Sequence, residues 1–197
     1  SSGGVFEPAP VSARPALPAP DPPRAFEGGY TDLFFEGLAR DVHHCDVRSL
    51  YPSILLREGR NPRRDSLGVF LRLLAHLRDF RVEAKQRARA PGIAPAAAGR
   101  WDARQTTFKI LINSFYGYLG FSQARFNDFD LAAAVTEQGR DILRGMVDRL
   151  RALGAMPIEI DTDGIYFTPP SGLDGDALER FRADFRAHLP AGIEVKF

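Results

Sequence analysis

Apolar residues recur at steps of three and four between residues 66 and 90, the spacing that places side chains on one face of an α-helix. The apolar face of this predicted helix consists of Leu67, Phe70, Leu71, Leu74 and Leu77, and basic residues continue the spacing at Arg81, Lys85 and Arg89. Residues 91–95 end it, and a second helix is predicted from about Arg100 through Asn113, ending near Gly117 and Gly120. We expect the two helices to pack as an antiparallel hairpin.

The rest of the chain combines one long amphipathic stretch with short apolar runs. A third helix is predicted over residues 130–153, with Gly154 as its stop. Its buried stripe is predicted to contain Leu131, Val135, Ile142, Met146 and Leu150. Short runs predict strands at residues 42–46, 156–160, 165–168 and 193–197, and residues 177–188 predict a fourth helix. This pattern predicts an α+β domain, an antiparallel sheet backed by helices, with the helical hairpin inserted.

Length and composition restrict the class of protein. The chain has 197 residues, of which 44% are hydrophobic and 26% charged, so it is long enough for one folded domain but too short for several. Seven prolines among residues 1–24 predict an extended linker over residues 1–25. With no apolar run near the ~20 residues of a membrane span and a single cysteine, Cys45, an intracellular protein without membrane contact is expected.

Charge is divided unevenly along the chain. The formal net charge is +1, but residues 57–104 carry twelve basic and five acidic side chains, whereas the remainder carries 14 basic and 20 acidic ones. A basic segment joined to an acidic one suits a protein that binds phosphates with one part and metal ions with the other.

Three aspartates follow apolar runs. Asp46 ends the first predicted strand, and Asp161 and Asp163 belong to an Asp-Thr-Asp-Gly sequence predicted to form a hairpin tip. Two acids at one edge of a sheet suit a pair of Mg²⁺ or Mn²⁺ ions. Asp-Gly is also a common turn dipeptide, so a purely structural role for this turn stays open here. His43 and His44 are interpreted as structural, because alternate strand residues face opposite sides.

Polar side chains also share faces of the two hairpin helices. Arg81 and Lys85 are four residues apart on the first helix, and Lys109 and Asn113 are four apart on the second. In an antiparallel pair, these groups could converge on a triphosphate. On the charge pattern alone, a solvated basic face is the more ordinary explanation of Arg81 and Lys85.

Tyr51 is the aromatic residue of most interest, because it follows Asp46 closely and precedes Pro52. A proline at the next position favours an extended backbone for Tyr51 and so predicts a ring held in one place. An aromatic side chain at a strand end is more often part of the core, so a binding role also stays open.

Three ordered segments resemble motifs A, B and C of family B DNA polymerases, and the likeness runs from about residue 26 to residue 197. The segments are residues 46–54, 109–117 and 158–164. The resemblance implies a polymerase palm at residues 26–66 and 123–197 and a two-helix fingers element at residues 67–122, with no thumb in the chain. It also implies a DNA-directed DNA polymerase that adds dNTPs to a primer 3′-hydroxyl with two Mg²⁺ or Mn²⁺ ions.

The resemblance assigns roles by position. Asp46, Asp163 and the carbonyl of Val47 would hold metal, with Asp161 as a less essential catalytic neighbour. The nucleotide would be bound by Arg81, Lys85, Lys109, Asn113, Ser49, Leu50 and Tyr51, the last of which would exclude a 2′-hydroxyl. Tyr116, Gly117, Gly28 and Gly29 would lie along the DNA. Two positions depart from the family, because Gly164 stands where many members have serine and Phe26 replaces a tyrosine.

The same resemblance implies partners, namely primer-template DNA, a dNTP, and exonuclease and thumb regions that this chain does not contain. It places the protein on DNA inside the cell. Two other functions remain: a non-catalytic polymerase-like module that binds nucleic acid or a partner, and another palm-based nucleotidyltransferase such as a cyclase. The second is less favoured, since a cyclase would not carry the segment at residues 109–117.

Overall fold

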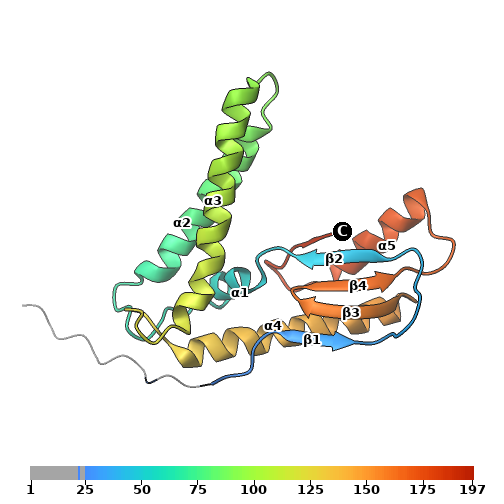
Figure 1. Ribbon diagram of the computed structural model, residues 1–197, viewed down its shortest axis with the longest axis horizontal. Coiled ribbons are helices and arrows are strands. Elements are labelled where there is room, and N and C mark those ends of the chain that lie inside the picture. The colour runs from blue at the N-terminus through green and yellow to red at the C-terminus, as the bar shows by residue number, and fades with distance from the viewer. Residues whose placement is uncertain (1–21, 23–24) are drawn as a thin grey trace, which may run out of the picture.

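The computed structural model describes residue 22 and residues 25–197, which form five helices and five strands (Figure 1). In chain order they are β1 (Tyr30–Leu33), β2 (His43–Val47), α1 (Leu50–Glu58), α2 (Val69–Ala88), α3 (Pro95–Leu119), α4 (Phe129–Ala152), β3 (Met156–Thr162), β4 (Gly164–Thr168), α5 (Gly175–Ala187) and β5 (Val195–Lys196). The α+β prediction is confirmed. The linker predicted at residues 1–25 lies outside the described residues, apart from residues 22 and 25.

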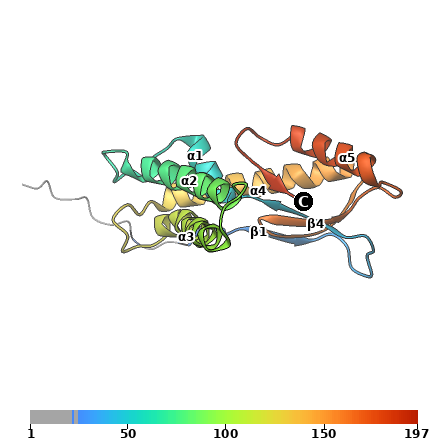
Figure 2. The same ribbon diagram turned by 90° about the horizontal axis from the view of Figure 1, so that it is seen from above.

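The strands form one antiparallel sheet in the order β1-β3-β4-β2-β5. Side chains alternate across it, so that one face is buried and the other is open. The buried face carries Cys45, Val47, Ile165 and Phe167, and the open face carries His44 and Tyr166. Figure 2 shows α4 and α5 together on one side of the sheet. The open face is therefore available at the strand ends where the predicted acids lie.

Helix α4 packs along the sheet and supplies much of the core. At its start the Asp128 carboxylate accepts a hydrogen bond from the N–H of Leu131 at 3.0 Å, a cap that contributes about 1 kcal/mol. At its end Gly154 adopts a φ of 79°, a conformation that glycine takes without strain. All five residues of the predicted stripe are buried. The prediction of this helix is confirmed.

Helices α2 and α3 pack against each other and project away from the sheet (Figure 1). The predicted hairpin is confirmed, although α3 begins at Pro95 rather than near Arg100, because proline suits the first position of a helix. The hairpin buries Phe70, Leu74 and Ile112. None of the described helices combines the length and apolarity needed to cross a bilayer.

Two elements lie outside the sequence predictions. Strand β1 pairs only with β3, and three of its four residues are exposed, so no apolar pattern marks it. Helix α1 begins at Leu50, with Pro52 in its first turn, where a missing N–H removes no helical hydrogen bond. Tyr51 is therefore helical, and the extended backbone predicted from its place before Pro52 is wrong.

Candidate functional site

The predicted acids meet at one end of the sheet. Asp46, in β2, pairs with Gly164, and Asp163 occupies the turn between β3 and β4. The N–H of Val47 donates a hydrogen bond to the carbonyl oxygen of Asp163 at 2.8 Å. This main-chain bond joins the end of β2 to the turn, so the backbone segments that carry the two acids are directly connected.

The turn that carries Asp163 is closed by the main chain. The N–H of Asp163 donates to the carbonyl oxygen of Asp161 at 2.7 Å, around Thr162, whose φ is 58°. A β-branched residue rarely adopts such a φ, and strained positions of this kind often accompany functional sites. Within the described part of the chain, the carboxylates of Asp46 and Asp163 accept no hydrogen bond and form no ion pair. The Asp163 side chain is thus not needed to close the turn.

Two other negative charges, those of Asp46 and Asp161, act on the Asp163 carboxyl group. Partial burial raises the pKa of Asp163 above its ordinary value, and the charges of Asp46 and Asp161 raise it further, whereas His44 and Lys109 act in the opposite direction. A divalent cation would relieve this repulsion. Two carboxylates and the Val47 carbonyl are the hard oxygen donors that Mg²⁺ prefers, so the donor set fits this metal.

Protein side chains alone do not complete a metal centre here. Among the described residues, no three His, Cys, Asp or Glu side chains converge as a ready-made site. This arrangement is compatible with Mg²⁺, which is commonly held by one or two carboxylates while water and substrate phosphates fill its remaining positions.

His44 occupies the space beside Gly164, a contact that the sequence does not reveal. A Cβ added at Gly164 would overlap Nε2 of His44 and lie 3.2 Å from its Cε1. The His44 ring also stacks on Tyr166, with ring centroids 4.5 Å apart. Glycine at this position therefore leaves room for the His44 ring. This packing accounts for Gly164 where many members of the family have serine.

Replacing Gly164 with serine is expected to lower the free energy of unfolding by about 0.5–1.5 kcal/mol, because the new side chain forces the exposed His44 ring out of its present position. Urea unfolding of the 197-residue chain measures the loss. The double variant Gly164→Ser with His44→Ala is expected to recover most of it, since the two side chains are in contact. An equal loss in the single and double serine variants would contradict this explanation.

Arg81 and Lys85 line a cavity of about 410 Å³ between α2 and the start of α1. Its other lining residues are Arg48, Ser49, Ser53, Arg78, Val82, Gly192 and Glu194. Burial lowers the pKa of both Arg81 and Lys85, and the nearby charge of Arg48 lowers both further. Within the described residues neither cation has an acidic partner, and the buried Nε of Arg81 has no hydrogen-bond acceptor. These features favour an anion site over a face of solvated ion pairs.

Lys109 and Asn113 lie exposed on α3 and do not line this cavity. Lys109 is close enough to the acids to lower the pKa of Asp163. The structure therefore brings Arg81 and Lys85 together and sets Lys109 toward the acid cluster. The convergence of all four groups on one triphosphate stays a prediction.

Tyr51 is wedged between two glycines. A Cβ added at Gly29 would lie 2.9 Å from the Tyr51 hydroxyl oxygen, and one at Gly139 would lie 3.0 Å from its Cε1. The ring also stacks on Tyr116, with centroids 4.5 Å apart. Both rings remain partly exposed, so burial in the core does not fully account for them. Gly139 leaves the space that the Tyr51 ring occupies, a contact that is visible only in the folded chain.

Helix α4 also holds the segment that precedes β1. Arg140 Nη1 donates hydrogen bonds to the carbonyl oxygens of Glu27 at 3.0 Å and Gly28 at 2.9 Å, and the Thr136 hydroxyl donates to that of Glu27 at 3.1 Å. A Cβ added at Gly28 or Gly117 would meet no atom within 4 Å. Packing inside the chain therefore does not require glycine at either position, and the space beside both is open.

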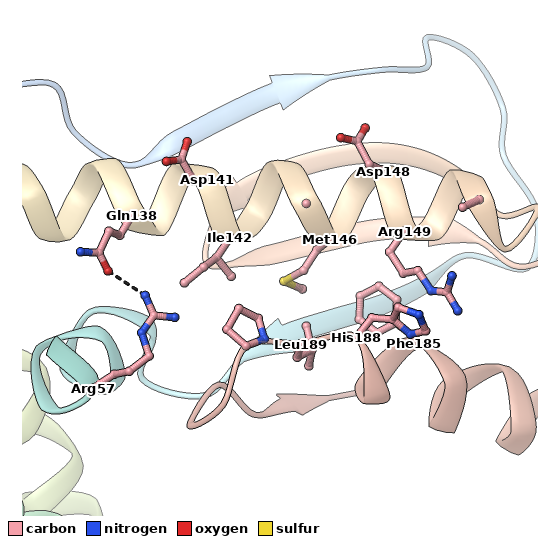
Figure 3. A pocket seen from close by; sticks show the side chains of 13 residues that line it. Arg57, Gln138, Asp141, Ile142, Met146, Asp148, Arg149, Phe185, His188 and Leu189 are labelled. Atoms are coloured by element: carbon pink, nitrogen blue, oxygen red, sulfur yellow. Dashed lines mark hydrogen bonds between the residues drawn. The ribbon is translucent and has the colours of Figure 1, made fainter.

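A larger cavity, about 670 Å³, lies between α4 and the end of α5 (Figure 3). Figure 3 shows its apolar walls, which include Ile142, Met146, Phe185 and Leu189. At one end Arg57 donates a hydrogen bond to Gln138 at 2.7 Å. No predicted site residue lines this cavity, so the candidate site consists of the acid cluster and the smaller cavity lined by Arg81 and Lys85.

Comparison with known proteins finds relatives over most of the chain. The chain is 29% identical over 197 residues to DNA polymerase 1 of Pyrococcus abyssi, a match that covers 88% of this chain and 25% of that protein. It is 31% identical over 199 residues to a DNA polymerase of Pyrococcus glycovorans, covering 88% of this chain and 25% of the relative. The chain thus spans about a quarter of the length of these relatives.

A solved structure shares the fold of the chain. The family B DNA polymerase of Pyrobaculum calidifontis superposes with a TM-score of 0.66 at 26% identity, covering 90% of this chain and 26% of that one. Residues 58–157, half of the chain, match the family described as DNA polymerase family B. The family match over half of the chain, together with the shared fold, establishes that the chain belongs to DNA polymerase family B.

Proposed function

We propose that the chain forms the nucleotidyl-transfer site of a DNA-directed DNA polymerase, with residues 26–66 and 123–197 as the palm and residues 67–122 as the fingers. The observation that carries the proposal is the main-chain bond that holds Asp46 and Asp163 at one end of the sheet, two carboxylates without a partner among the described residues, while Arg81 and Lys85 line a cavity together with Arg48, which follows Asp46 by two residues. Acids that hold cations and cations that hold phosphates are the two requirements of templated phosphoryl transfer.

In the proposed reaction the primer 3′-hydroxyl attacks the α-phosphorus of a dNTP. A new P–O bond forms while the bond from the α-phosphorus to the bridging oxygen breaks, pyrophosphate leaves, and the hydroxyl proton passes to solvent. Arg81, Lys85 and Lys109 bind the triphosphate and offset the charge that develops on the leaving group, with Asn113 supporting them. Two Mg²⁺ or Mn²⁺ ions, held by Asp46, Asp163 and the Val47 carbonyl beside Asp161, would stabilise the negative charge of the reacting phosphate.

Other residues orient the nucleotide and the DNA in this proposal. Ser49 lines the cationic cavity and Leu50 follows it at the start of α1, and Tyr51 blocks the position of a 2′-hydroxyl. Tyr116 and Gly117 follow the minor-groove side of the new base pair, whereas Gly28 and Gly29 approach the template strand. The open space beside Gly28 and Gly117 supports close contact with a nucleic acid backbone.

The proposed partners are primer-template DNA and a dNTP, with the thumb and exonuclease regions supplied by polypeptide beyond these residues. The spatial division of charge supports them, because basic side chains gather on α2 while the acids lie at the sheet end. The protein is accordingly proposed to act on DNA inside the cell.

The 197-residue chain is expected to bind a dNTP in the presence of Mn²⁺, and Arg81→Ala should weaken that binding by about 10-fold or more, because a charge-assisted contact is lost. Isothermal titration calorimetry measures the affinity. Arg104→Ala removes the same charge from an exposed position on α3 and is the matched control, expected to bind as the native chain does. A native chain that binds no dNTP, or equal weakening in both variants, would instead favour a non-catalytic module.

A further inference from the structure

Lys85 lies among several basic side chains, and within the described residues it forms no ion pair, although Glu194 lines the same cavity. The charges that lower its pKa, after the effect of burial, come from Arg48, Arg89, Arg81 and Lys196. Only Arg81 belongs to the predicted triphosphate set. Arg48 follows β2 directly and lines the cavity from the sheet side, whereas Lys196, in β5, does not line it. Arg48 therefore adds one more cation to the cavity, opposite the α2 residues and next to Glu194.

Arg48 stands between two cavities. It lines the 410 Å³ cavity together with Arg81 and Lys85, and it also lines an adjoining cavity of about 370 Å³ together with Arg186. Glu194 is shared by both cavities in the same way. An anion that moved from the first cavity to the second would therefore pass the Arg48 guanidinium and meet a further cation at Arg186.

The Arg48 side chain is not needed to hold the fold at this point. Its Nη1 donates to Glu194 Oε2 at 3.1 Å, but the two side chains are 50% and 71% exposed. The main chain already joins the same residues, because the N–H of Arg48 donates to the carbonyl oxygen of Glu194 at 2.8 Å. Exposed ion pairs contribute little to stability. Since one donor of a five-donor guanidinium is used, the remaining donors are free for an anion.

We propose that Arg48 is a further phosphate-binding residue, which takes the leaving pyrophosphate from Arg81 and Lys85 and guides it toward the adjoining cavity. Glu194 orients the guanidinium and, being negative, prevents the anion from being held too tightly. This inference rests on the proposed nucleotidyl transfer, because that reaction supplies the pyrophosphate. A forked cation suits pyrophosphate, since its donors can bind two oxygens at once.

The test is calorimetric titration of the 197-residue chain with inorganic pyrophosphate in the presence of EDTA, so that no metal takes part. Arg48→Ala is expected to weaken binding by about 10- to 100-fold, the loss of a charge-assisted pair of hydrogen bonds. Arg48→Lys is expected to fall between this variant and the native chain, because it keeps the charge but loses the fork. Glu194→Gln should bind pyrophosphate at least as tightly as the native chain.

The matched control is Arg151→Ala, since Arg151 on α4 is also exposed and ion-paired, with Asp148 at 3.5 Å. It should change pyrophosphate affinity by less than about twofold, because distant surface charges are screened. The proposal is overturned if the native chain binds no pyrophosphate, if Arg48→Ala binds as Arg151→Ala does, or if Glu194→Gln weakens binding as much as Arg48→Ala. The titration contains no metal ion, so its outcome does not depend on the metal-binding role proposed for Asp46 and Asp163. A failure of the metal acids in their own assay is thereby distinguishable from a failure of Arg48.

Discussion

Asp163→Asn is expected to lower the rate of primer extension by at least about 10³-fold, the equivalent of roughly 4 kcal/mol of transition-state stabilisation lost with a metal ligand. The measurement is single-nucleotide extension by a full-length polymerase that carries this segment. In the 197-residue chain, the same substitution should reduce Mn²⁺ binding measured by electron paramagnetic resonance. Asp46→Asn should lower the extension rate and Mn²⁺ binding in the same way, because Asp46 lies at the same end of the sheet as Asp163.

Two features make this variant a clean test. Asparagine preserves the size of the side chain, and the turn is held by main-chain bonds of Val47, Asp161 and Asp163 that the substitution leaves in place. Removing this negative charge should also not destabilise the fold, because burial and the charges of Asp46 and Asp161 raise the pKa of Asp163 and so disfavour its charged form. Asp148→Asn, an exposed change on α4, is the control. Normal extension by Asp163→Asn would rule out the proposed metal site.

Tyr51→Ala is expected to reduce discrimination against ribonucleotides by on the order of 10²-fold, because the ring that would clash with a 2′-hydroxyl is removed. The ring is fixed by Gly29, Gly139 and the stacked Tyr116, so it cannot move aside in the native protein. The quantity to measure is kcat/KM for a dNTP divided by kcat/KM for the matching ribonucleotide, in the full-length polymerase.

Tyr51→Phe separates the ring from its hydroxyl group. It should keep discrimination within about threefold of the native value, because the ring and its stacking on Tyr116 survive. Gly139→Ala should lower discrimination as well, since its Cβ would lie 3.0 Å from the Tyr51 ring and displace it. A Tyr51→Phe variant as permissive as Tyr51→Ala would show that the hydroxyl, not the ring, performs the selection.

Sequence patterns predict those parts of the fold in which apolar residues recur at a regular spacing. The α2 and α3 hairpin, α4 and the hairpin tip at Asp163 all follow from apolar spacing and turn residues. The patterns do not predict β1, whose edge position leaves most of its residues exposed, or α1, where Pro52 suggested an extended chain. In both cases tertiary contacts override the local signal.

The candidate site, too, could be predicted only in part from the sequence. Acids at strand ends and cations at four-residue spacing identify Asp46, Asp163, Arg81 and Lys85 as candidates. The pairing of β2 with β4 decides that His44 meets Gly164, and no pattern within either segment contains that register. Arg48 and Glu194 are 146 residues apart, so their contact also depends on the completed sheet. The sequence therefore predicts which residues are candidates for the site, but it does not predict which residues meet across the sheet.

The hydrogen bond from the Val47 N–H to the Asp163 carbonyl oxygen has a consequence for inactive variants. Because the bond uses main-chain atoms, substitution of either acid should abolish the proposed catalysis while the sheet remains folded. In a full-length polymerase, such a protein would still be able to occupy primer ends and would compete there with active copies. Substitutions of Asp46 or Asp163 should therefore act as dominant inhibitors of synthesis, whereas substitutions that unfold the sheet should be recessive.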